Sequence, residues 1–186
     1  MRRVVFLACL LRLVAYGQSV ERNELTFTGG YGWQATVELG EQRLSAVSLG
    51  GNYSFRVRRW LALEAGLLTA IDPSGAQNSE YGVFNIHDRY TWLPIGVRFI
   101  VPLRHDRFEI SGGVGGVYER YSGGSTPISA ESYSGGGGYF KAKAAFALDS
   151  RRHFWLGTTP HFFLVNGTYS KRDRWFVLTG DISFRF

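Results

Sequence analysis

The sequence predicts an all-β protein: an eight-stranded antiparallel up-and-down transmembrane β-barrel. Apolar and polar residues alternate with a period of two, the spacing of a strand with two different faces, in about eight segments. Short and long links alternate between these segments, as they do when tight hairpin turns gather at one end of an antiparallel sheet. The segments run for about 10 to 13 residues, which matches the roughly 9 to 11 residues of a tilted strand that crosses a bilayer.

The first 17 residues are expected to be a cleaved signal peptide, with one barrel domain over residues 18–186. Arg2 and Arg3 precede the apolar run Val4–Leu11, and the small-residue pattern Ala15-Tyr16-Gly17 follows. The apolar run is far below the roughly 20 residues of a spanning helix. Cys9, the only cysteine, would leave with the signal, so no internal disulfide is expected in the mature chain. A lipid anchor on Cys9 is the alternative.

The strands are expected, in chain order, at residues 24–34, 44–55, 60–70, 89–101, 108–120, 136–148, 153–166 and 174–186. The 24 glycines and the 16% share of aromatic residues suit strands with tight turns and close backbone contacts. Each segment carries large apolar side chains on one face. In the same order these are Leu25, Phe27 and Tyr31; Val47, Leu49 and Tyr53; Leu61, Leu63 and Leu67; Leu93, Ile95, Val97 and Phe99; Ile110 and Val114; Phe140 and Phe146; Leu156 and Phe162; and Ile182.

The links fall into two kinds. Residues 55–60, 101–108 and 148–153 are short and rich in arginine, so they are predicted to form tight turns. Residues 35–43, 71–88, 121–135 and 167–173 are richer in Gly, Ser, Asn or Thr and are predicted to be four loops at the opposite end.

The second face of the strands is predicted to line a sealed polar lumen with a charge network. Its residues are Glu64, Arg98, Glu109, Glu119, Lys141, Lys143, Asp181 and Arg185, with His161 as a hydrogen-bonding member. If residues 101–108 form a tight hairpin, Arg98 and Glu109 come close to opposite each other. Interleaved glycines would leave space for these side chains, because an eight-stranded barrel has little interior room.

A soluble barrel with the apolar face inside and the charges in water is the alternative. Two features favour the membrane. The charges on the polar face nearly balance, so they can pair inside a lumen. Aromatic residues also gather near the strand ends, as rings do at the two interfaces of a bilayer. These residues are Tyr31, Trp33, Tyr53, Phe55, Trp60, Tyr90, Trp92, Phe108, Tyr118, Phe154, Trp155, Phe184 and Phe186.

The C-terminal strand, WFVLTGDISFRF, resembles the last strand of the small OmpA/OmpX/opacity-type outer-membrane barrels of Gram-negative bacteria. Phe184, Arg185 and Phe186 match the aromatic-Arg-Phe ending of that family, and Ile182 and Gly180 continue the alternation. The resemblance covers essentially the whole chain when the signal peptide and the strand count are included. It implies location in the outer membrane, and an assembly signal at Gly180, Ile182, Phe184 and Phe186 that the insertion machinery recognises.

The sequence offers little catalytic chemistry. An enzyme that modifies lipid A is one alternative, and it needs a serine, a histidine and an acid that converge at one membrane interface. His161 is the only histidine well inside a predicted strand, and it is followed by Phe162 and Phe163. A small pore is the other alternative. No cofactor motif, metal set or nucleic-acid signature is present, and half of the net charge of +6 comes from Arg2, Arg3 and Arg12.

These observations predict a monomeric structural or surface protein of the outer membrane. Its partners would be outer-membrane lipids and lipopolysaccharide, the assembly machinery during insertion, and an extracellular ligand bound for adhesion through the four loops. The basic run Lys171-Arg172-Asp173-Arg174 could contact lipopolysaccharide phosphates.

Overall fold

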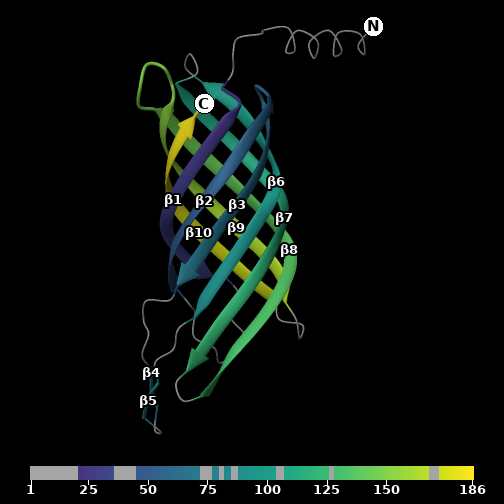
Figure 1. Ribbon diagram of the computed structural model, residues 1–186, viewed down its shortest axis with the longest axis vertical. Helices are drawn as coiled ribbons and strands as arrows, with labels where there is room; N and C mark the ends of the chain where they lie inside the picture. The colour runs from purple at the N-terminus through teal and green to yellow at the C-terminus, as the bar shows by residue number, and fades with distance from the viewer. Residues whose placement is uncertain are drawn as a thin grey trace, which may run out of the picture.

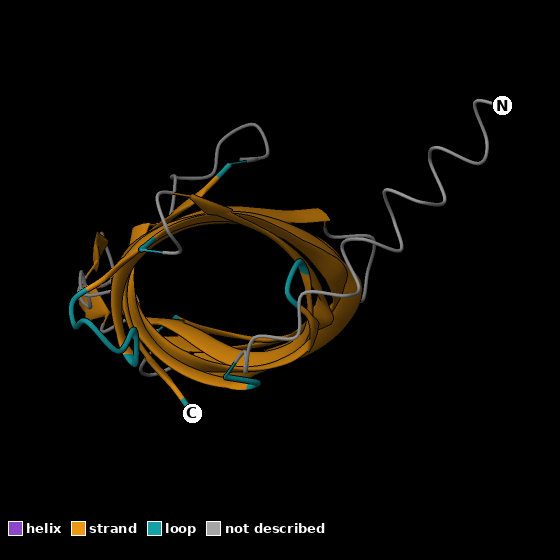
Figure 2. Cartoon of the chain, turned by 90° about the horizontal axis from the view of Figure 1, so that it is seen from above, coloured by secondary structure: helices purple, strands orange, loops and turns teal. Residues whose placement is uncertain are grey.

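The computed structural model describes residues 21–35, 45–71, 77–79, 82–84, 88–103, 107–125, 128–167 and 172–186. Eight antiparallel strands form a closed barrel, so the predicted fold class is confirmed (Figures 1 and 2). The barrel strands are β1 (Asn23–Gln34), β2 (Ser45–Arg58), β3 (Leu61–Ile71), β6 (Arg89–Leu103), β7 (Phe108–Ser125), β8 (Ile128–Ala147), β9 (Phe154–Gly167) and β10 (Arg172–Arg185). The short strands β4 (Gln77–Ser79) and β5 (Gly82–Phe84) form a separate hairpin. The predicted signal peptide lies outside the described residues.

The first and last strands close the barrel. β1 pairs with β10 from Glu24 opposite Arg185 to Gln34 opposite Trp175. One step further, the amide of Asn23 donates to the carbonyl of Phe186 at 3.0 Å, and the amide of Phe186 donates back at 2.9 Å. Closure satisfies the backbone groups that an open sheet edge would leave exposed to hydrocarbon. Within the described part of the chain, no helix is long and apolar enough to cross a bilayer.

The two ends of the barrel differ. The end that carries Asn23, Phe186 and the links β2–β3, β6–β7 and β8–β9 is called the turn end, and the opposite end is called the loop end (Figure 1). In the β8–β9 turn, Asp149 Oδ1 accepts a hydrogen bond from the amide of Phe154 at 2.9 Å. In the same turn, Arg152 has a positive φ of 64°, and its carbonyl accepts from Trp155 Nε1 at 2.6 Å.

Strands β7 and β8 are longer than the sequence predicts, and the expectation of a loop over residues 121–135 is wrong. The two strands pair as far as Ser125 opposite Ile128, and the hairpin projects at the loop end (Figure 1). Tyr121 and Tyr133 lie opposite each other with stacked rings, 4.6 Å between centroids. The Gly- and Ser-rich composition indicated a loop, but cross-strand pairing of aromatic rings stabilises the hairpin instead.

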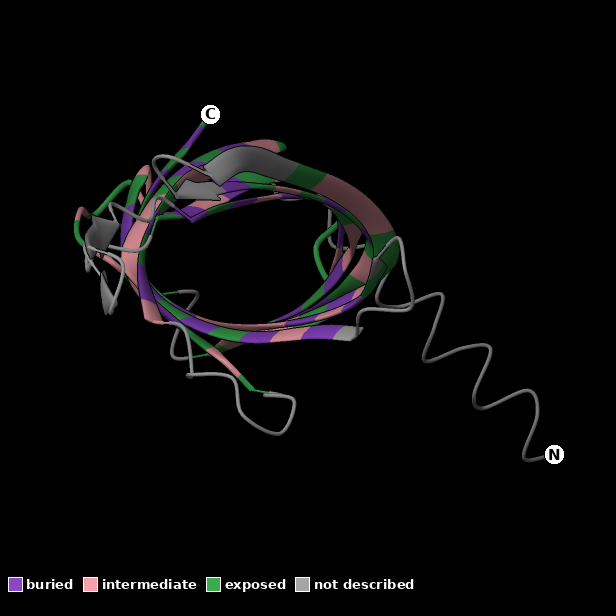
Figure 3. Cartoon of the chain, turned by 90° about the horizontal axis from the view of Figure 1, so that it is seen from below, coloured by how far each residue is buried: buried purple, intermediate pink, exposed green. Residues whose placement is uncertain are grey.

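Buried and exposed residues alternate along the barrel strands, as the sequence pattern predicts (Figure 3). Phe27, Leu49 and Ile95 are 63–66% exposed on the outer face, whereas Glu24, Ser48 and Glu119 are fully buried on the inner face. A soluble barrel would place its large apolar residues inside. An apolar outer wall around a polar interior is the arrangement of a membrane-spanning barrel.

Three of the aromatic residues expected at the membrane interfaces lie inside the barrel instead. Tyr90, Trp92 and Trp155 are 4% exposed or less. They sit near strand ends, as expected, but they have the inward phase of the alternation: Trp92 precedes outward-facing Leu93, and Trp155 precedes outward-facing Leu156. The phase within the strand decides which face a ring occupies, and the distance from the strand end does not.

Candidate functional site: the lumen and its two ends

The turn-end half of the lumen holds a group of buried charges, here called the ion cluster. Three carboxylates and five cations from seven strands contribute to it, so cations exceed carboxylates. The members are Glu24, Arg56, Glu64, Arg98, Glu109, Lys141, Lys143 and Arg185. Each lies on the inward phase of its strand, where desolvation makes pairing a requirement for a charged group.

Glu24 is the centre of the ion cluster. Its two carboxylate oxygens accept hydrogen bonds from Arg98 Nη1 and Nη2, both at 3.0 Å, in a bidentate arrangement. Lys143 Nζ donates to the same carboxylate at 3.0 Å and Arg185 Nε donates at 2.8 Å. One carboxylate therefore compensates three buried cations that come from β6, β8 and β10.

Glu109 and Glu64 extend the ion cluster to either side. Glu109 Oε2 accepts from Arg56 Nη2 at 2.5 Å and from Arg185 Nη2 at 2.9 Å. Glu64 lies 2.9 Å from Lys141 Nζ and accepts a hydrogen bond from the hydroxyl of Tyr139 at 2.8 Å.

The expectation that Arg98 and Glu109 lie nearly opposite each other across the β6–β7 turn is wrong. The register places Arg98 opposite Gly113 and Glu109 opposite Pro102. Arg98 reaches across the lumen to Glu24, whose strand is not a neighbour of β6 in the barrel.

Asp181 and His161 lie apart from the salt bridges of the ion cluster. Asp181 accepts hydrogen bonds from the hydroxyls of Thr159 and Thr179, the latter at 2.9 Å. His161 Nε2 is 3.3 Å from Thr179 Oγ1, and its ring stacks on Phe163 at 5.9 Å between centroids. Both side chains thus join a hydrogen-bonded layer next to the ion cluster.

The loop-end half of the lumen contains packed rings, here called the aromatic plug: Tyr90, Trp92, Tyr139, Phe163 and Trp175. Trp92 lies parallel to Phe163 with centroids 4.8 Å apart, and it meets Trp175 edge-on at 5.5 Å. Tyr90 packs against Trp175 at 4.7 Å. Trp92, Phe163 and Trp175 are all fully buried, so the rings fill this half of the lumen.

Glu119, expected in the charge network, lies instead beside the aromatic plug. Its Oε2 accepts from Trp92 Nε1 at 2.5 Å, and no cation pairs with it among the described residues. Nearer the loop end, Tyr121 donates to Asp88 at 2.6 Å and Tyr133 donates to Asp173 at 2.8 Å. The acidic groups of this half are therefore held by aromatic donors.

The sequence interpretation missed Glu24, Arg56 and the aromatic plug. Glu24 precedes outward-facing Leu25, and Arg56 follows outward-facing Phe55, so the alternation carried the signal for both. Arg56 was missed because the predicted strand ended at residue 55, whereas β2 continues to Arg58. Trp175 and Val177 of β10 also lie on the inward phase, because they alternate with Arg174, Phe176 and Leu178.

Three residues of the predicted assembly signal lie on the outer face of β10, and the fourth, Phe186, follows directly after the strand. Gly180, Ile182, Phe184 and Phe186 are all exposed, and the rings of Phe184 and Phe186 stack at 5.6 Å. Arg185, between the two rings, points inward to Glu24 and Glu109.

Replacing Phe186 by alanine is expected to impair assembly of the barrel in cells without impairing its folding in detergent. The backbone bonds to Asn23 do not need the ring, so refolding of the purified chain in detergent should hardly change. In cells the same variant should yield less folded barrel, measured as the heat-modifiable band in the outer-membrane fraction. Phe27→Ala, which removes an exposed ring opposite Ile182, is the control. Equal yields of both variants in cells would contradict an assembly signal at the terminal Phe.

The described residues contain no group of three His, Cys, Asp or Glu side chains placed to hold a metal ion. The expectation that the chain uses neither a metal nor another cofactor stays a prediction.

Comparison with known proteins identifies the fold. No protein-family model matches the chain, and no curated protein matches it by sequence. Neisserial surface protein A, NspA, is similar with a TM-score of 0.68 and 10% identity, over 88% of this chain and 97% of that one. Ail, the attachment invasion locus protein of Yersinia pestis, has a TM-score of 0.58 and 13% identity, over 89% and 100%. The outer membrane protein OprG from Pseudomonas aeruginosa has a TM-score of 0.58 and 9% identity, over 89% and 97%.

Proposed function

We propose that this chain, which has the fold of the small outer-membrane β-barrels, is a surface protein of a Gram-negative-type outer membrane. In this proposal the lumen is sealed and the loop end contacts a ligand outside the cell. Short turns face the periplasm and long loops face the exterior in barrels of this type. The projecting β7–β8 hairpin therefore lies on the outside of the cell.

The filled lumen is the observation that carries the proposal. The ion cluster occupies the turn-end half and the aromatic plug occupies the loop-end half, and an eight-stranded barrel has little room beyond its own side chains. Because side chains occupy both halves of the lumen, a structural or surface role is favoured over a small pore. Planar-bilayer recordings of the wild type should therefore show no steady conductance.

Lipopolysaccharide is the proposed lipid partner at the loop end. Arg89 and Arg120 are exposed there on neighbouring strands, β6 and β7. Arginine side chains at this height of the outer wall suit the phosphates of lipid A and the inner core. We propose that these two side chains, together with the basic run at residues 171–174, hold the barrel in the outer leaflet.

Adhesion is the proposed role of the loop end. The name of Ail describes attachment and invasion, and one structure of Ail is a complex with the heparin analogue sucrose octasulfate, at a TM-score of 0.53 and 11% identity to this chain. By analogy of fold alone, we propose that the β7–β8 hairpin and the neighbouring loops contact a host or matrix surface.

Shortening the β7–β8 hairpin tests this role. Ser122 and Ser132 are register partners, so replacing residues 123–131 by Asn-Gly joins them through a two-residue turn. A laboratory bacterium expressing this variant should keep the heat-modifiable barrel. Its adherence to cultured animal cells and immobilised heparin should fall to that of bacteria without the protein. Arg58→Gln at the turn end is the control. Unchanged adherence of the shortened variant, with a folded barrel, would exclude this hairpin from adhesion.

A lipid A-modifying enzyme is the second candidate, and the surroundings of His161 weigh against it. A lipid A substrate would approach from the outer wall, whereas His161 lies on the inward phase with Phe163 and Thr179 as partners. A catalytic base needs its nucleophile within hydrogen-bond reach. The hydroxyl within that reach belongs to Thr179, which itself donates to Thr159 O at 3.1 Å and to Asp181.

A further inference from the structure

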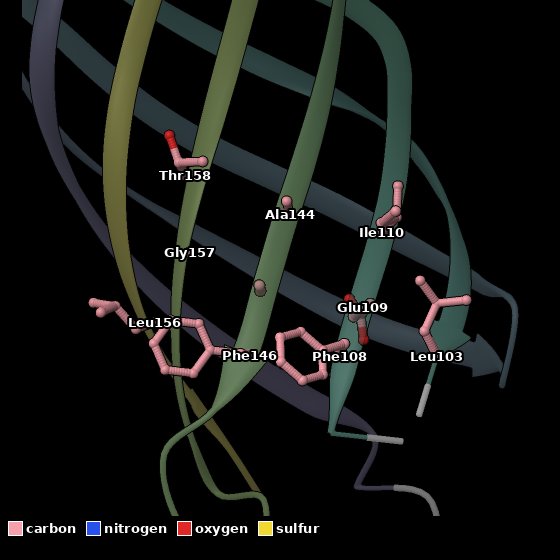
Figure 4. A pocket seen from close by; sticks show the side chains of 10 residues that line it. Leu103, Phe108, Glu109, Ile110, Ala144, Phe146, Leu156, Gly157 and Thr158 are labelled. Carbon is pink, nitrogen blue, oxygen red and sulfur yellow. The ribbon is translucent and has the colours of Figure 1, made fainter. Parts of the chain in front are cut away.

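The outer wall of the barrel has an apolar groove near the turn end (Figure 4). Its volume is about 850 Å³. Four strands contribute to it: Leu103 of β6, Phe108 and Ile110 of β7, Ala144 and Phe146 of β8, and Leu156 of β9. These side chains lie on the outer face, and Leu103, Phe108, Ile110 and Phe146 are 40–54% exposed. The groove therefore opens toward lipid, and the buried residues Glu109 and Ala145 also line it.

Two small residues, Ala144 and Thr158, lie on the floor of this groove. Ala144 lies opposite Thr158, and Gly180, beyond the groove, continues the row of small residues on the next strand. Larger side chains stand on both sides of the row. Phe146 lies opposite Leu156 toward the turn end, and Phe140 stacks on Phe162 at 5.0 Å toward the loop end. Three strands about 4.8 Å apart give the row a length of about 10 Å.

The chemistry of the groove suits a hydrocarbon chain. The hydroxyl of Thr158 donates to the carbonyl of Thr179 at 2.9 Å, so it offers no free donor to a ligand. The remaining lining side chains on the outer face are apolar. A flexible acyl chain can fill a groove of this kind without leaving a polar group unpaired.

The two turns next to the groove, β6–β7 and β8–β9, carry the complementary charge for a lipid headgroup. Arg107 immediately precedes Phe108, and Arg151 lies in the turn that joins the strands of Phe146 and Leu156. Both arginines are exposed, and neither forms an ion pair with another described residue. Arginine is well suited to bind phosphate oxygens. Because short turns face the periplasm in such barrels, these arginines lie at the phospholipid-rich inner leaflet.

We infer that this groove binds an acyl chain of an anionic phospholipid from the periplasmic leaflet, with Arg107 and Arg151 at its phosphate. The inference rests on the outer-membrane location proposed above and is independent of the adhesive role of the loop end. It assigns Ala144 of β8 and Thr158 of β9 a role as the floor of a lipid-binding groove, which larger side chains at these positions would fill.

Native mass spectrometry of the purified full-length barrel tests the site. The barrel in detergent is mixed with phosphatidylglycerol, phosphatidylethanolamine or lipopolysaccharide, and the retained lipid is counted. Ala144→Phe fills the floor of the groove from the outer face. Ala65→Phe is the matched control, because Ala65 is an exposed alanine on β3, outside the groove. Heat-modifiable gel mobility checks that each variant is folded, which tests the barrel separately from the lipid site.

The wild type and Ala65→Phe should retain phosphatidylglycerol, and Ala144→Phe should retain about tenfold less, which corresponds to about 1.4 kcal/mol. The double variant Arg107→Gln/Arg151→Gln should reduce retention of phosphatidylglycerol toward that of phosphatidylethanolamine. Equal retention by Ala144→Phe and Ala65→Phe, or preferential retention of lipopolysaccharide by the wild type, would overturn the inference. If Ala144→Phe does not fold, Thr158→Leu fills the same floor and is judged by the same outcomes.

Discussion

Replacing Glu24 by glutamine is expected to lower the free energy of unfolding by about 3–5 kcal/mol, the range for breaking a buried ion pair. Glu24 is fully buried and compensates Arg98, Lys143 and Arg185 at 2.8–3.0 Å. Glutamine keeps the shape of the side chain but removes the negative charge. The ion cluster already has more cations than carboxylates, so no spare anion can replace it.

Urea-induced unfolding of the barrel in lipid vesicles or detergent measures this loss. Glu21→Gln is the control, because Glu21 is partly exposed and, among the described residues, pairs with His153 alone, at 3.0 Å. An exposed pair is worth about 0–1 kcal/mol, so that variant should unfold nearly like the wild type. The double variant Glu24→Gln/Lys143→Met should recover part of the loss, because it removes one uncompensated cation. A loss for Glu24→Gln no larger than that of the control would show that the ion cluster tolerates the missing charge.

Replacing Trp92 by alanine is expected to cost about 3–5 kcal/mol, as for other large-to-small substitutions of buried rings. Trp92 contacts Phe163 and Trp175 in the centre of the aromatic plug, so its removal leaves a void between them. The carboxylate of Glu119 also loses its donor at 2.5 Å and stays buried. Both effects destabilise the folded barrel in the same direction.

The same unfolding assay measures the Trp92→Ala variant, with Trp33→Ala as the control. Trp33 is 42% exposed on the outer wall, where it stacks on Phe176 and meets Tyr31 edge-on, so its loss should cost clearly less than the loss of a fully buried ring. Planar-bilayer recordings of the wild type should show no steady conductance, because the plug and the ion cluster occupy the lumen. Steady conductance in the nanosiemens range would contradict the sealed lumen, whatever the stability of the variants.

The positions of the strands followed from the sequence because alternation is a local property. A side chain of a strand points to the face opposite that of its neighbour, so the pattern Ile182, Phe184, Phe186 fixes the outer face of β10 without knowledge of any other strand. The same rule correctly placed Arg98 and Asp181 on the inner face. The prediction was wrong where another criterion replaced this rule: nearness to a strand end for Trp92, and Gly-rich composition for residues 121–135.

The sequence by itself therefore determined a closed eight-stranded barrel with an apolar outer wall and charged residues in the lumen. Only the tertiary structure decided which charges meet. Arg98 pairs with Glu24, 74 positions away, across the lumen and not across a hairpin. The physical reason is that a contact across the lumen depends on the registers of all the strands between the two residues. The alternation within one strand does not specify those registers. The aromatic plug and the lipid-facing groove arise in the same way, from side chains of β6 to β10 that only closure of the barrel brings side by side.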